Sequence, residues 1–457
     1  MSSDVLVGRF SIDELIKAGA ISAHKDGNFG SLYPRIDDFV DDGIPLLTAK
    51  VVNAGRIDFG AAQRLSKEKA AKLPYGFIQA DDVLLSHNAT VGRVAVVPKF
   101  NGQAMIGTSL TYFRLDKSRL LPRYLACFFE SRDFQNQLAS IMGLSTRNQV
   151  PITAQRLLAV EVPPLAVQRE LSAFVGAIDD RITLLRETNA TLEAIAQALF
   201  KSWFVDFDPV RAKMQGRTPE GMNEATAALF PDALEESELG LVPRGWQVIS
   251  VADVSSVIKG KSYSSKDLVT EHDTALVTLK SFERGGGFRL DGFKPYSGTY
   301  KQTQVVVPGD LIIAYTDVTQ AAELIGKPAI VIGVSAHSTL VASLDVGIVR
   351  AIESKVSRQF LYGIFKADVF QAHTFSHTSG TTVLHLSKDG VGSYKFACPS
   401  FELVSAFSTV AETLAGRRQV NIDQMRTLTT LRDTLLPRLI SGQLPLPEAK
   451  SVHPINP

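Results

Sequence analysis

Apolar residues recur every seven positions in two long stretches of the chain. One row is Leu171, Ile178, Leu185, Leu192 and Leu199, and the other is Phe407, Leu414, Asn421, Leu428 and Leu435. Such sustained heptad rows are typical of coiled-coil helices. Pro163-Pro164 stand where the first helix would begin, a position that suits proline. We therefore predict long helices over 165–205 and 401–442.

The positions three residues after each row are of mixed character. They are Phe174, Arg181, Thr188, Ile195 and Ser202 in the first stretch, and Val410, Arg417, Gln424, Leu431 and Arg438 in the second. This mixture argues against a simple parallel zipper, and antiparallel pairing of the two helices with each other is the simplest arrangement. The alternative is that each helix packs only on its own domain. From Leu171 to Ser202 a helix spans roughly 48 Å, more than one domain would cover.

Short apolar runs between turn residues precede each long helix. They predict strands at 83–85, 94–97, 305–307, 311–313 and 329–332. A short helix is expected from about Pro122 to Leu138, and another from Ser357 to His373. Each part that precedes a long helix is therefore predicted to be an α+β domain.

The chain also contains an internal repeat. Pro399 lies 236 positions after Pro163, and the same offset relates Arg114 to Arg350 and Gln135 to Gln371. Upstream the register drifts, as loop insertions would produce, so that Ala80–Leu85 matches Pro308–Ile313. Fixed-offset similarity indicates a duplicated architecture.

Together these patterns predict an α+β fold with two domains in tandem, separated by two long helices that pair as an antiparallel coiled coil with pseudo-twofold symmetry. The expected boundaries are a first domain at 1–164, a helix at 165–205, a turn-rich linker at 206–245, a second domain at 246–400, a helix at 401–442 and a loose tail at 443–457.

Composition excludes several classes of protein. The 457 residues carry 48 Lys+Arg against 47 Asp+Glu, which excludes a protein that coats nucleic acid by bulk charge but allows local basic loops. Two cysteines cannot form a disulfide scaffold. The start MSSDVLVGRF lacks a signal-peptide pattern, and no apolar stretch is long enough to span a membrane. We therefore expect a cytoplasmic protein with no membrane contact.

Motifs for catalysis are scarce. Gly260-Lys261-Ser262 lacks the first glycine of a phosphate-binding P-loop, and G-x-S-x-G does not occur. Asp345, Glu353 and Lys355 faintly match the pattern of a metal-dependent nuclease, which remains one alternative. A duplicated scaffold that binds only proteins is another. We expect no catalytic residues, no metal site and no bound cofactor.

Polar loops follow the predicted strands at equivalent places in both domains. Arg, Asn, Gln, Ser, Thr and His side chains can contact base edges and phosphates. The candidate DNA-binding residues are Lys50, Ser86, His87, Asn88, Thr90, Arg93, Ser145, Thr146, Arg147, Asn148 and Gln149 in the first domain, and Lys280, Tyr315, Thr316, Ser379, Thr381, Thr382 and His385 in the second.

Two helix ends and one linker segment resemble a known family. ALFKSWFVDF at 198–207 and LLPRLISG at 435–442 resemble the conserved regions of specificity subunits of type I restriction–modification enzymes. ESELGLVPRGW at 236–246 is similar to the segment by which those proteins enter their second recognition domain. The resemblance spans the whole chain, although the recognition domains match only in layout.

The resemblance implies a non-catalytic subunit that recognises a bipartite, asymmetric sequence in double-stranded DNA. It implies two methyltransferase subunits and restriction subunits as partners, with S-adenosylmethionine, ATP and Mg expected on those partners. By analogy the helix ends carry the partner interface, with Phe200, Trp203, Phe204, Leu436, Leu439 and Ile440 as apolar candidates. The helices would set the distance between the half-sites, at most about 14 base pairs. The low net charge leads us to expect weak DNA binding by the isolated chain and firm binding by the assembled enzyme.

Overall fold

The computed structural model describes residues 6–53, 55–143, 148–290, 292–319, 322–333, 336–440 and 444. The chain forms two compact units, the first made of residues 1–184 and 424–457 and the second of residues 185–423. Each unit contains part of both long helices, α6 (Leu165–Phe204) and α12 (Phe401–Ile440). The two helices have the predicted positions, and α6 begins directly after Pro163-Pro164.

The first unit is built on two four-stranded sheets. One has the order β2-β11-β8-β9 and the other β10-β4-β7-β3. The strands are β2 (Ile21–Asp26), β11 (Leu110–Leu115), β8 (Val83–Ser86), β9 (Val94–Val96), β10 (Met105–Ile106), β4 (Ile44–Leu47), β7 (Gln63–Leu65) and β3 (Phe39–Val40). Shorter pairs are β1 (Gly8–Ser11) with β12 (Ala159–Val162) and β5 (Val52–Asn53) with β6 (Arg56–Ile57). The short helices are α1 (Ile12–Lys17), α2 (Lys67–Ala71), α3 (Pro122–Glu130), α4 (Arg132–Gly143) and α5 (Ile152–Gln155).

The second unit repeats this plan. Its sheets have the orders β16-β24-β20-β22 and β18-β17-β23-β19. The strands are β16 (Ser255–Lys259), β24 (Val346–Ala351), β20 (Leu311–Ala314), β22 (Pro328–Ile330), β18 (Lys294–Pro295), β17 (Thr274–Val277), β23 (Thr339–Ala342) and β19 (Val305–Val306). A further sheet, β21 (Thr316–Asp317), β26 (Leu384–Leu386) and β25 (Thr378–Ser379), joins two loops, and β15 (Gln247–Ser250) pairs with β27 (Lys395–Cys398). The helices are α9 (Val251–Val254), α10 (Arg358–Lys366) and α11 (Asp368–Ser376).

Strand β8 is apolar from Val83 to Leu85 because both of its faces are covered. Val83 and Leu85 face a core that also contains Phe113 and Tyr124, whereas Leu84 faces the core between the two sheets. In the second unit Leu311 and Ile313 face helix α10, and Ile312 faces the other sheet. Because successive side chains of a strand point to opposite faces, a strand covered on both sides must be apolar throughout.

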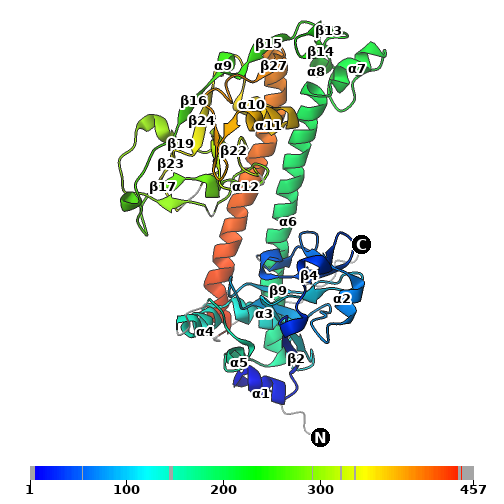
Figure 1. Cartoon of the computed structure of the whole chain (residues 1–457), viewed down its shortest axis with the longest axis vertical. Helices are drawn as coiled ribbons and strands as arrows, with labels where there is room; N and C mark the ends of the chain where they lie inside the picture. The colour runs from blue at the N-terminus through cyan, green and yellow to red at the C-terminus, as the bar shows by residue number, and fades with distance from the viewer. Residues whose placement is uncertain are drawn as a thin grey trace, which may run out of the picture. The chain divides into compact units, whose positions relative to one another are not determined.

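Helix α10 lies between the sheet and the long helices of the second unit (Figure 1). Phe360 and Phe365 of α10 share one core with Leu311 and Val349 of the sheet and with Phe407 of α12. In the first unit Tyr124 and Phe129 of α3 have the equivalent places, in a core with Leu171 of α6 and Leu439 of α12. The long helices therefore complete the core of each unit.

The long helices run antiparallel where they meet, as predicted. In the first unit Arg432 donates to Asp179 over 2.9 Å, and Val175 contacts Leu436. In the second unit Asn421 donates to Asn189 over 2.8 Å, and Arg418 pairs with Glu193.

The companion rows differ from the prediction. The buried apolar positions in the first half of α6 are Leu171, Val175, Ile178, Ile182 and Leu185, so the second row follows the first by four residues and not by three. In α12, Ala411 is buried, whereas Val410 and Leu431 of the predicted row are 41% and 43% exposed. The apolar stripe must also cover a domain, and that wider demand shifts it from a two-helix seam.

Two other predictions need correction. The helix expected over 122–138 is two helices, α3 and α4, with Ser131 between them in extended conformation, and α10 and α11 are likewise divided at Ala367. The predicted linker at 206–245 is folded as α7 (Asp208–Met214), α8 (Glu224–Ala228) and the hairpin β13 (Leu234–Ser237) and β14 (Gly240–Pro243). It contributes Val210 and Phe230 to the core of the second unit. The tail at 443–457 lies outside the described residues except Leu444.

The duplication extends to individual polar contacts. The Arg114 guanidinium binds both oxygens of Asp82, at 2.9 and 2.7 Å, and Arg350 binds Asp310 at 2.6 Å. The Asp82 and Asp310 side chains are only 2% and 4% exposed. Each carboxylate also accepts a backbone N–H, from Gln79 or Val307. These ion pairs fix the start of the central strand in both units.

A second repeated contact comes from an amide. The Gln135 side chain donates to the carbonyls of Gly92 and Phe129, and Gln371 donates to those of Gly326 and Phe365. The ring pairs Phe129–Phe134 and Phe365–Phe370 both stack, with centroids 4.2 and 4.4 Å apart. These matched contacts confirm the 236-residue register of the repeat.

Asp82→Asn should destabilise the first unit by about 3 kcal/mol or more, because removal of one partner leaves a charged Arg114 without its counter-ion. The matched control is Asp81→Asn, which removes an exposed partner of Lys117 and should cost less than about 1 kcal/mol. Asn is suitable there because Asp81 has a φ of 71°. Urea unfolding followed by peptide-resolved hydrogen exchange measures the loss of unfolding free energy in each variant. Equal losses for Asp82→Asn and Asp81→Asn would contradict the proposed role of the Asp82–Arg114 pair.

Candidate nucleic-acid interface

Two polar segments meet at one end of the central sheet of the first unit. Asn88 and Gln149 form an isolated β-bridge. The Ala89 N–H donates to the Asn148 carbonyl over 3.1 Å, and the Val150 N–H donates to the His87 carbonyl over 2.8 Å. The structure thus brings together the two candidate loops that follow β8 and precede α5. Ser145, Thr146 and Arg147 lie outside the described residues.

The second unit joins the equivalent segments more extensively. Strand β21 pairs with β26, with Thr316 opposite His385, and β25 extends the same sheet. The Leu386 N–H donates to the Tyr315 carbonyl over 2.9 Å, as Val150 does to His87 in the first unit. The counterpart loops inferred from the repeat therefore occupy equivalent places.

The two candidate lysines follow equivalent strands. Lys50 and Lys280 are exposed on the 3₁₀ turns η3 (Ala49–Val51) and η5 (Leu279–Ser281), directly after β4 and β17. Ser109 connects η3 to the loop after β8: its Oγ accepts the Ala49 N–H, and its carbonyl accepts the His87 N–H. Lys50 therefore belongs to the same end of the sheet as Asn88.

Three candidates in the first unit have structural roles. Ser86 is fully buried and its Oγ accepts the Arg93 N–H over 2.8 Å. The Arg93 guanidinium donates to the Ala49 and Val52 carbonyls, at 2.8 and 3.0 Å, so it holds the η3 turn. His87 is 6% exposed. None of these side chains is presented to a ligand in this conformation.

Two candidates in the second unit are also enclosed. Tyr315 and Thr316 are 6% and 7% exposed, and the Thr316 hydroxyl donates to Asp345 over 2.9 Å. The exposed candidates are Lys50, Thr90 and Asn148 in the first unit, and Lys280, Ser379, Thr381, Thr382 and His385 in the second. Asn88 and Gln149 are half-buried.

Asp317 is a residue that the sequence analysis missed. It is fully buried, and its carboxylate accepts the N–H and hydroxyl of Thr319 and the N–H groups of Leu324 and Ile325. Burial alone would raise its pKa, but these donors lower the pKa below the ordinary value of Asp. Asp317 therefore organises the loop beside β21 as a charged acceptor. An Asp followed two positions later by Thr is a turn signal that could have indicated this.

The apolar residues predicted as a partner interface lie in the protein core. Phe200 and Trp203 are each 4% exposed, and Phe204 packs against Phe360 and Phe407 with centroids 4.9 and 5.3 Å away. Leu436 and Leu439 are 4% and 5% exposed, and Ile440 packs against the core of the first unit. The prediction was wrong because each helix end covers a domain, a role that also requires large apolar side chains.

The nuclease alternative is not supported by the geometry. Asp345 and Glu353 flank the six-residue strand β24, which separates them by roughly 20 Å. Glu353 pairs with Arg358, and Lys355 donates to the Asp253 carbonyl. Within the described ranges, no three His, Cys, Asp or Glu residues cluster as metal ligands.

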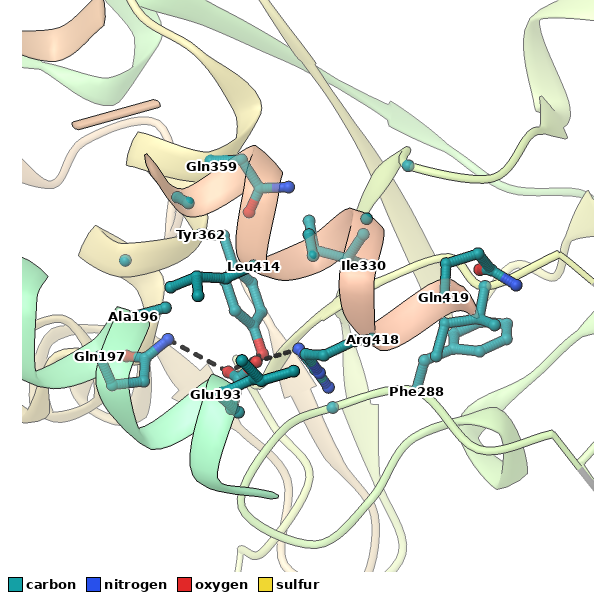
Figure 2. Close-up of a pocket in the computed structure, with 18 of the residues that line it drawn as sticks. Glu193, Ala196, Gln197, Phe288, Ile330, Gln359, Tyr362, Leu414, Arg418 and Gln419 are labelled. Atoms are coloured by element: carbon teal, nitrogen blue, oxygen red, sulfur yellow. Dashed lines mark hydrogen bonds and ion pairs between the residues drawn. The ribbon is translucent and has the colours of Figure 1, made fainter. Parts of the chain in front are cut away.

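A polar cluster joins α10 to both long helices of the second unit. Glu193 accepts a hydrogen bond from the Tyr362 hydroxyl over 2.9 Å and pairs with Arg418, and Gln197 donates to it over 3.2 Å (Figure 2). Burial raises the pKa of Tyr362 well above its ordinary value, so it remains a donor. The cluster lines a cavity of about 250 Å³ with mainly apolar walls, including Phe288, Ile330 and Leu414. Its contacts position the second domain on the helices.

Buried histidines distinguish the first unit. His24 contacts Gln155 over 3.2 Å, and Gln155 donates to Thr111 over 3.0 Å. By register, the second unit has Val257, Val391 and Gly347 at these positions. Burial lowers the pKa of His24 to about 4 and also lowers the pKa of His87. The first unit thus holds neutral imidazoles beneath its candidate loop.

These histidines predict acid sensitivity of the first unit. As the pH falls below about 6.5, the unfolded chain binds a proton on His24 that the folded unit takes up only near pH 4, so stability decreases in this window, by up to about 3 kcal/mol. Urea unfolding at a series of pH values, followed by pulse-labelled hydrogen exchange, would measure the loss. The variant His24→Val/Gln155→Val should reduce it in first-unit peptides and leave second-unit peptides unchanged; an unaltered pH dependence would contradict the assignment to His24.

Part of the chain matches a known domain family. The family model described as "Type I restriction modification DNA specificity domain" matches residues 16–194. This range includes the central sheet of the first unit and the first candidate loops.

Two curated relatives match most of the chain. The type I restriction enzyme HindI specificity subunit of Haemophilus influenzae is 24% identical over 80% of this chain and 87% of its own length. The MjaIX specificity subunit of Methanocaldococcus jannaschii is 22% identical over 91% of this chain and 90% of its own length.

A solved structure was also found. The type I restriction–modification system S subunit from M. genitalium is 13% identical, with a TM-score of 0.48 over 96% of this chain and 97% of that one. Residues 16–194 thus match a type I restriction modification DNA specificity domain, and most of the chain is similar to specificity subunits of type I restriction enzymes.

Proposed function

We propose that this chain recognises a bipartite, asymmetric sequence in double-stranded DNA, one half with each α+β domain, as the non-catalytic specificity subunit of a type I restriction–modification enzyme. One observation carries the proposal: the duplicated framework places equivalent loops at the same end of both central sheets, but with different exposed side chains. Asn88 bridges Gln149 where Thr316 pairs with His385. Equivalent surfaces with unlike side chains suit recognition of two different half-sites.

The exposed side chains have the chemistry that DNA recognition needs. Lys50 and Lys280 can neutralise phosphates, while Asn148 and His385 offer hydrogen-bonding groups to base edges. Strand pairing holds His385, and the bridge holds Gln149, so these groups meet DNA with little loss of conformational freedom. Buried residues such as Ser86 and Asp317 shape the loops without contact to DNA.

The proposed partners follow from the similarity to type I specificity subunits. We infer that the chain works in a complex with two methyltransferase subunits and with restriction subunits, because a duplicated scaffold can bind two copies of one partner through equivalent contacts. S-adenosylmethionine, ATP and Mg are proposed to bind to those partners. Within the described part of the chain, no helix is long and apolar enough to span a membrane.

Substitutions in the exposed loops of one unit should alter one half of the recognised sequence. The variant Ser379→Ala/Thr381→Ala/Thr382→Ala/His385→Ala should relax or abolish recognition of one half-site, because each lost base contact costs about 1–3 kcal/mol of discrimination. Thr90→Ala/Asn148→Ala should affect the other half. Sequencing of modified adenines in cells that express the chain with its methyltransferase subunit would report the motif.

Matched controls are available at the opposite end of each sheet. Lys99 follows β9 and Glu353 follows β24, both exposed and far from the loops. Lys99→Ala and Glu353→Ala should leave the motif unchanged. Loss of both halves in either loop variant would contradict division of the site between domains, and an absence of any sequence-dependent modification by the parent enzyme would refute the function itself.

A further inference from the structure

In each unit, a glycine that follows one strand packs against the backbone of a neighbouring segment. Gly27 follows β2 and packs on Gly107, and Gly260 follows β16 and packs on Ser343; a Cβ atom at either glycine would lie within 2.3 Å of the opposing backbone. The Gly107 N–H donates to Leu47 and the Ser343 N–H to Val277. These matched contacts show which residues of the two units correspond to each other beside the candidate interface.

The first unit fills the space next to this glycine contact with apolar side chains. Phe29, two residues after Gly27, is 6% exposed and lies against Gly76, where a Cβ atom would be 2.8 Å from the ring. Leu73 belongs to the same core cluster. The ring contact requires glycine at position 76. The Phe29 ring therefore fills this space in the first unit and closes it.

The second unit leaves the equivalent space open. Arg114 donates to the Phe77 carbonyl and Arg350 to that of Val305, which aligns Gly76 with Gln304 and Leu73 with Lys301. Phe29 is replaced by Ser262. The result is a crevice of about 420 Å³, lined by Gly260, Lys261, Ser262, Thr299, Tyr300, Lys301, Gln304 and Leu344.

The charge of this surface also differs between the units. Lys259 and Lys261 flank Gly260, whereas Asp26 and Asn28 flank Gly27. With Lys301 the second unit has three cations here; the first unit has Asp26 and Lys72, which stands where the second has Tyr300. The crevice lining contains no carboxylate. A strongly positive, hydroxyl-lined surface is therefore specific to the second unit.

The crevice adjoins the proposed DNA-binding loops. Leu344 lies in its lining, and the neighbouring Asp345 accepts the Tyr315 N–H and the Thr316 hydroxyl. Lys259 extends over the Tyr315 ring, with Nζ 6.0 Å from its centroid. The crevice and the His385 loop are thus attached to the same turn.

We propose that this crevice binds a phosphate of the DNA backbone, so that the second unit supplies more of the electrostatic binding than the first. The proposal rests on the proposed function and adds an asymmetry to it. Lys261 and Lys301 neutralise the phosphate, and the Ser262 and Thr299 hydroxyls donate to its oxygens.

Salt dependence of DNA binding tests the proposal. Each phosphate contact contributes about 0.9 to the slope of log K against log salt concentration. In the complex with the methyltransferase subunits, bound to a duplex with the mapped motif, Lys261→Ala/Lys301→Ala should reduce the slope by about 0.9, because one phosphate contact is lost. Lys261→Arg/Lys301→Arg should retain it, and Lys99→Ala should not change it. Ser262→Phe, which introduces the ring of the first unit, should weaken binding without a change of charge.

The outcomes separate this proposal from the function on which it depends. If Lys261→Ala/Lys301→Ala binds the mapped duplex with an unchanged slope, the crevice holds no phosphate, although sequence-specific modification by the complex stands. If the slope decreases equally for Lys99→Ala, the effect is one of general charge and the proposal is overturned. If the parent complex does not distinguish the mapped duplex from a random one, the proposed function fails as well.

Discussion

The central sheet of each unit is buried on both faces, and much of the structure follows from that constraint. Leu84 and Leu85 of β8 face different cores, as Ile312 and Ile313 of β20 do. One face is covered by the second sheet of the same unit. The other needs α3 or α10 together with parts of α6 and α12. A small domain cannot bury such a face alone, and the long helices supply the missing apolar surface.

This dependence explains the large aromatic residues at the helix ends. Trp203 makes an edge-to-face contact with Phe204, and Phe200 and Phe204 make such contacts with Phe360. All three also meet Phe407 edge-to-face, geometry that adds to the free energy of area burial. Glu193, Tyr362 and Arg418 add directional bonds at the same junction. By the 236-residue offset, Asn189 corresponds to Met425 and Asn421 to Leu185, so the Asn189–Asn421 hydrogen bond has no counterpart in the repeat. This one polar layer therefore marks a unique register along the helices.

The duplicated units share their framework but not their ligand-facing surface. The Asp82–Arg114 and Asp310–Arg350 pairs, the Gln135 and Gln371 amides and the glycine contacts are the same in both. His24 and Gln155 are replaced by valines, and Phe29 by Ser262. Removal of one partner of a buried ion pair strongly destabilises the fold. Side chains at strand ends, in contrast, can change with little effect on the core. A scaffold of this kind can acquire two different binding specificities.

The repeat, the long helices, the strands and the positions of the loops could be predicted from the chain, because these depend on local apolar periodicity and on a fixed offset. The helix-end segments also indicated the resemblance to specificity subunits. Which side chains are available for binding depends on three-dimensional packing. Ser86 and His87 have the polar chemistry of DNA-binding residues yet are buried, and Arg93 donates to backbone carbonyls of its own unit. Phe200 has the character of an interface residue yet completes a core. The companion row of the helices moved by one position because it covers a domain as well as a helix. The crevice beside Gly260 depends on Ser262 and Gln304 meeting across the fold, and residues that meet only in three dimensions leave no pattern along the chain.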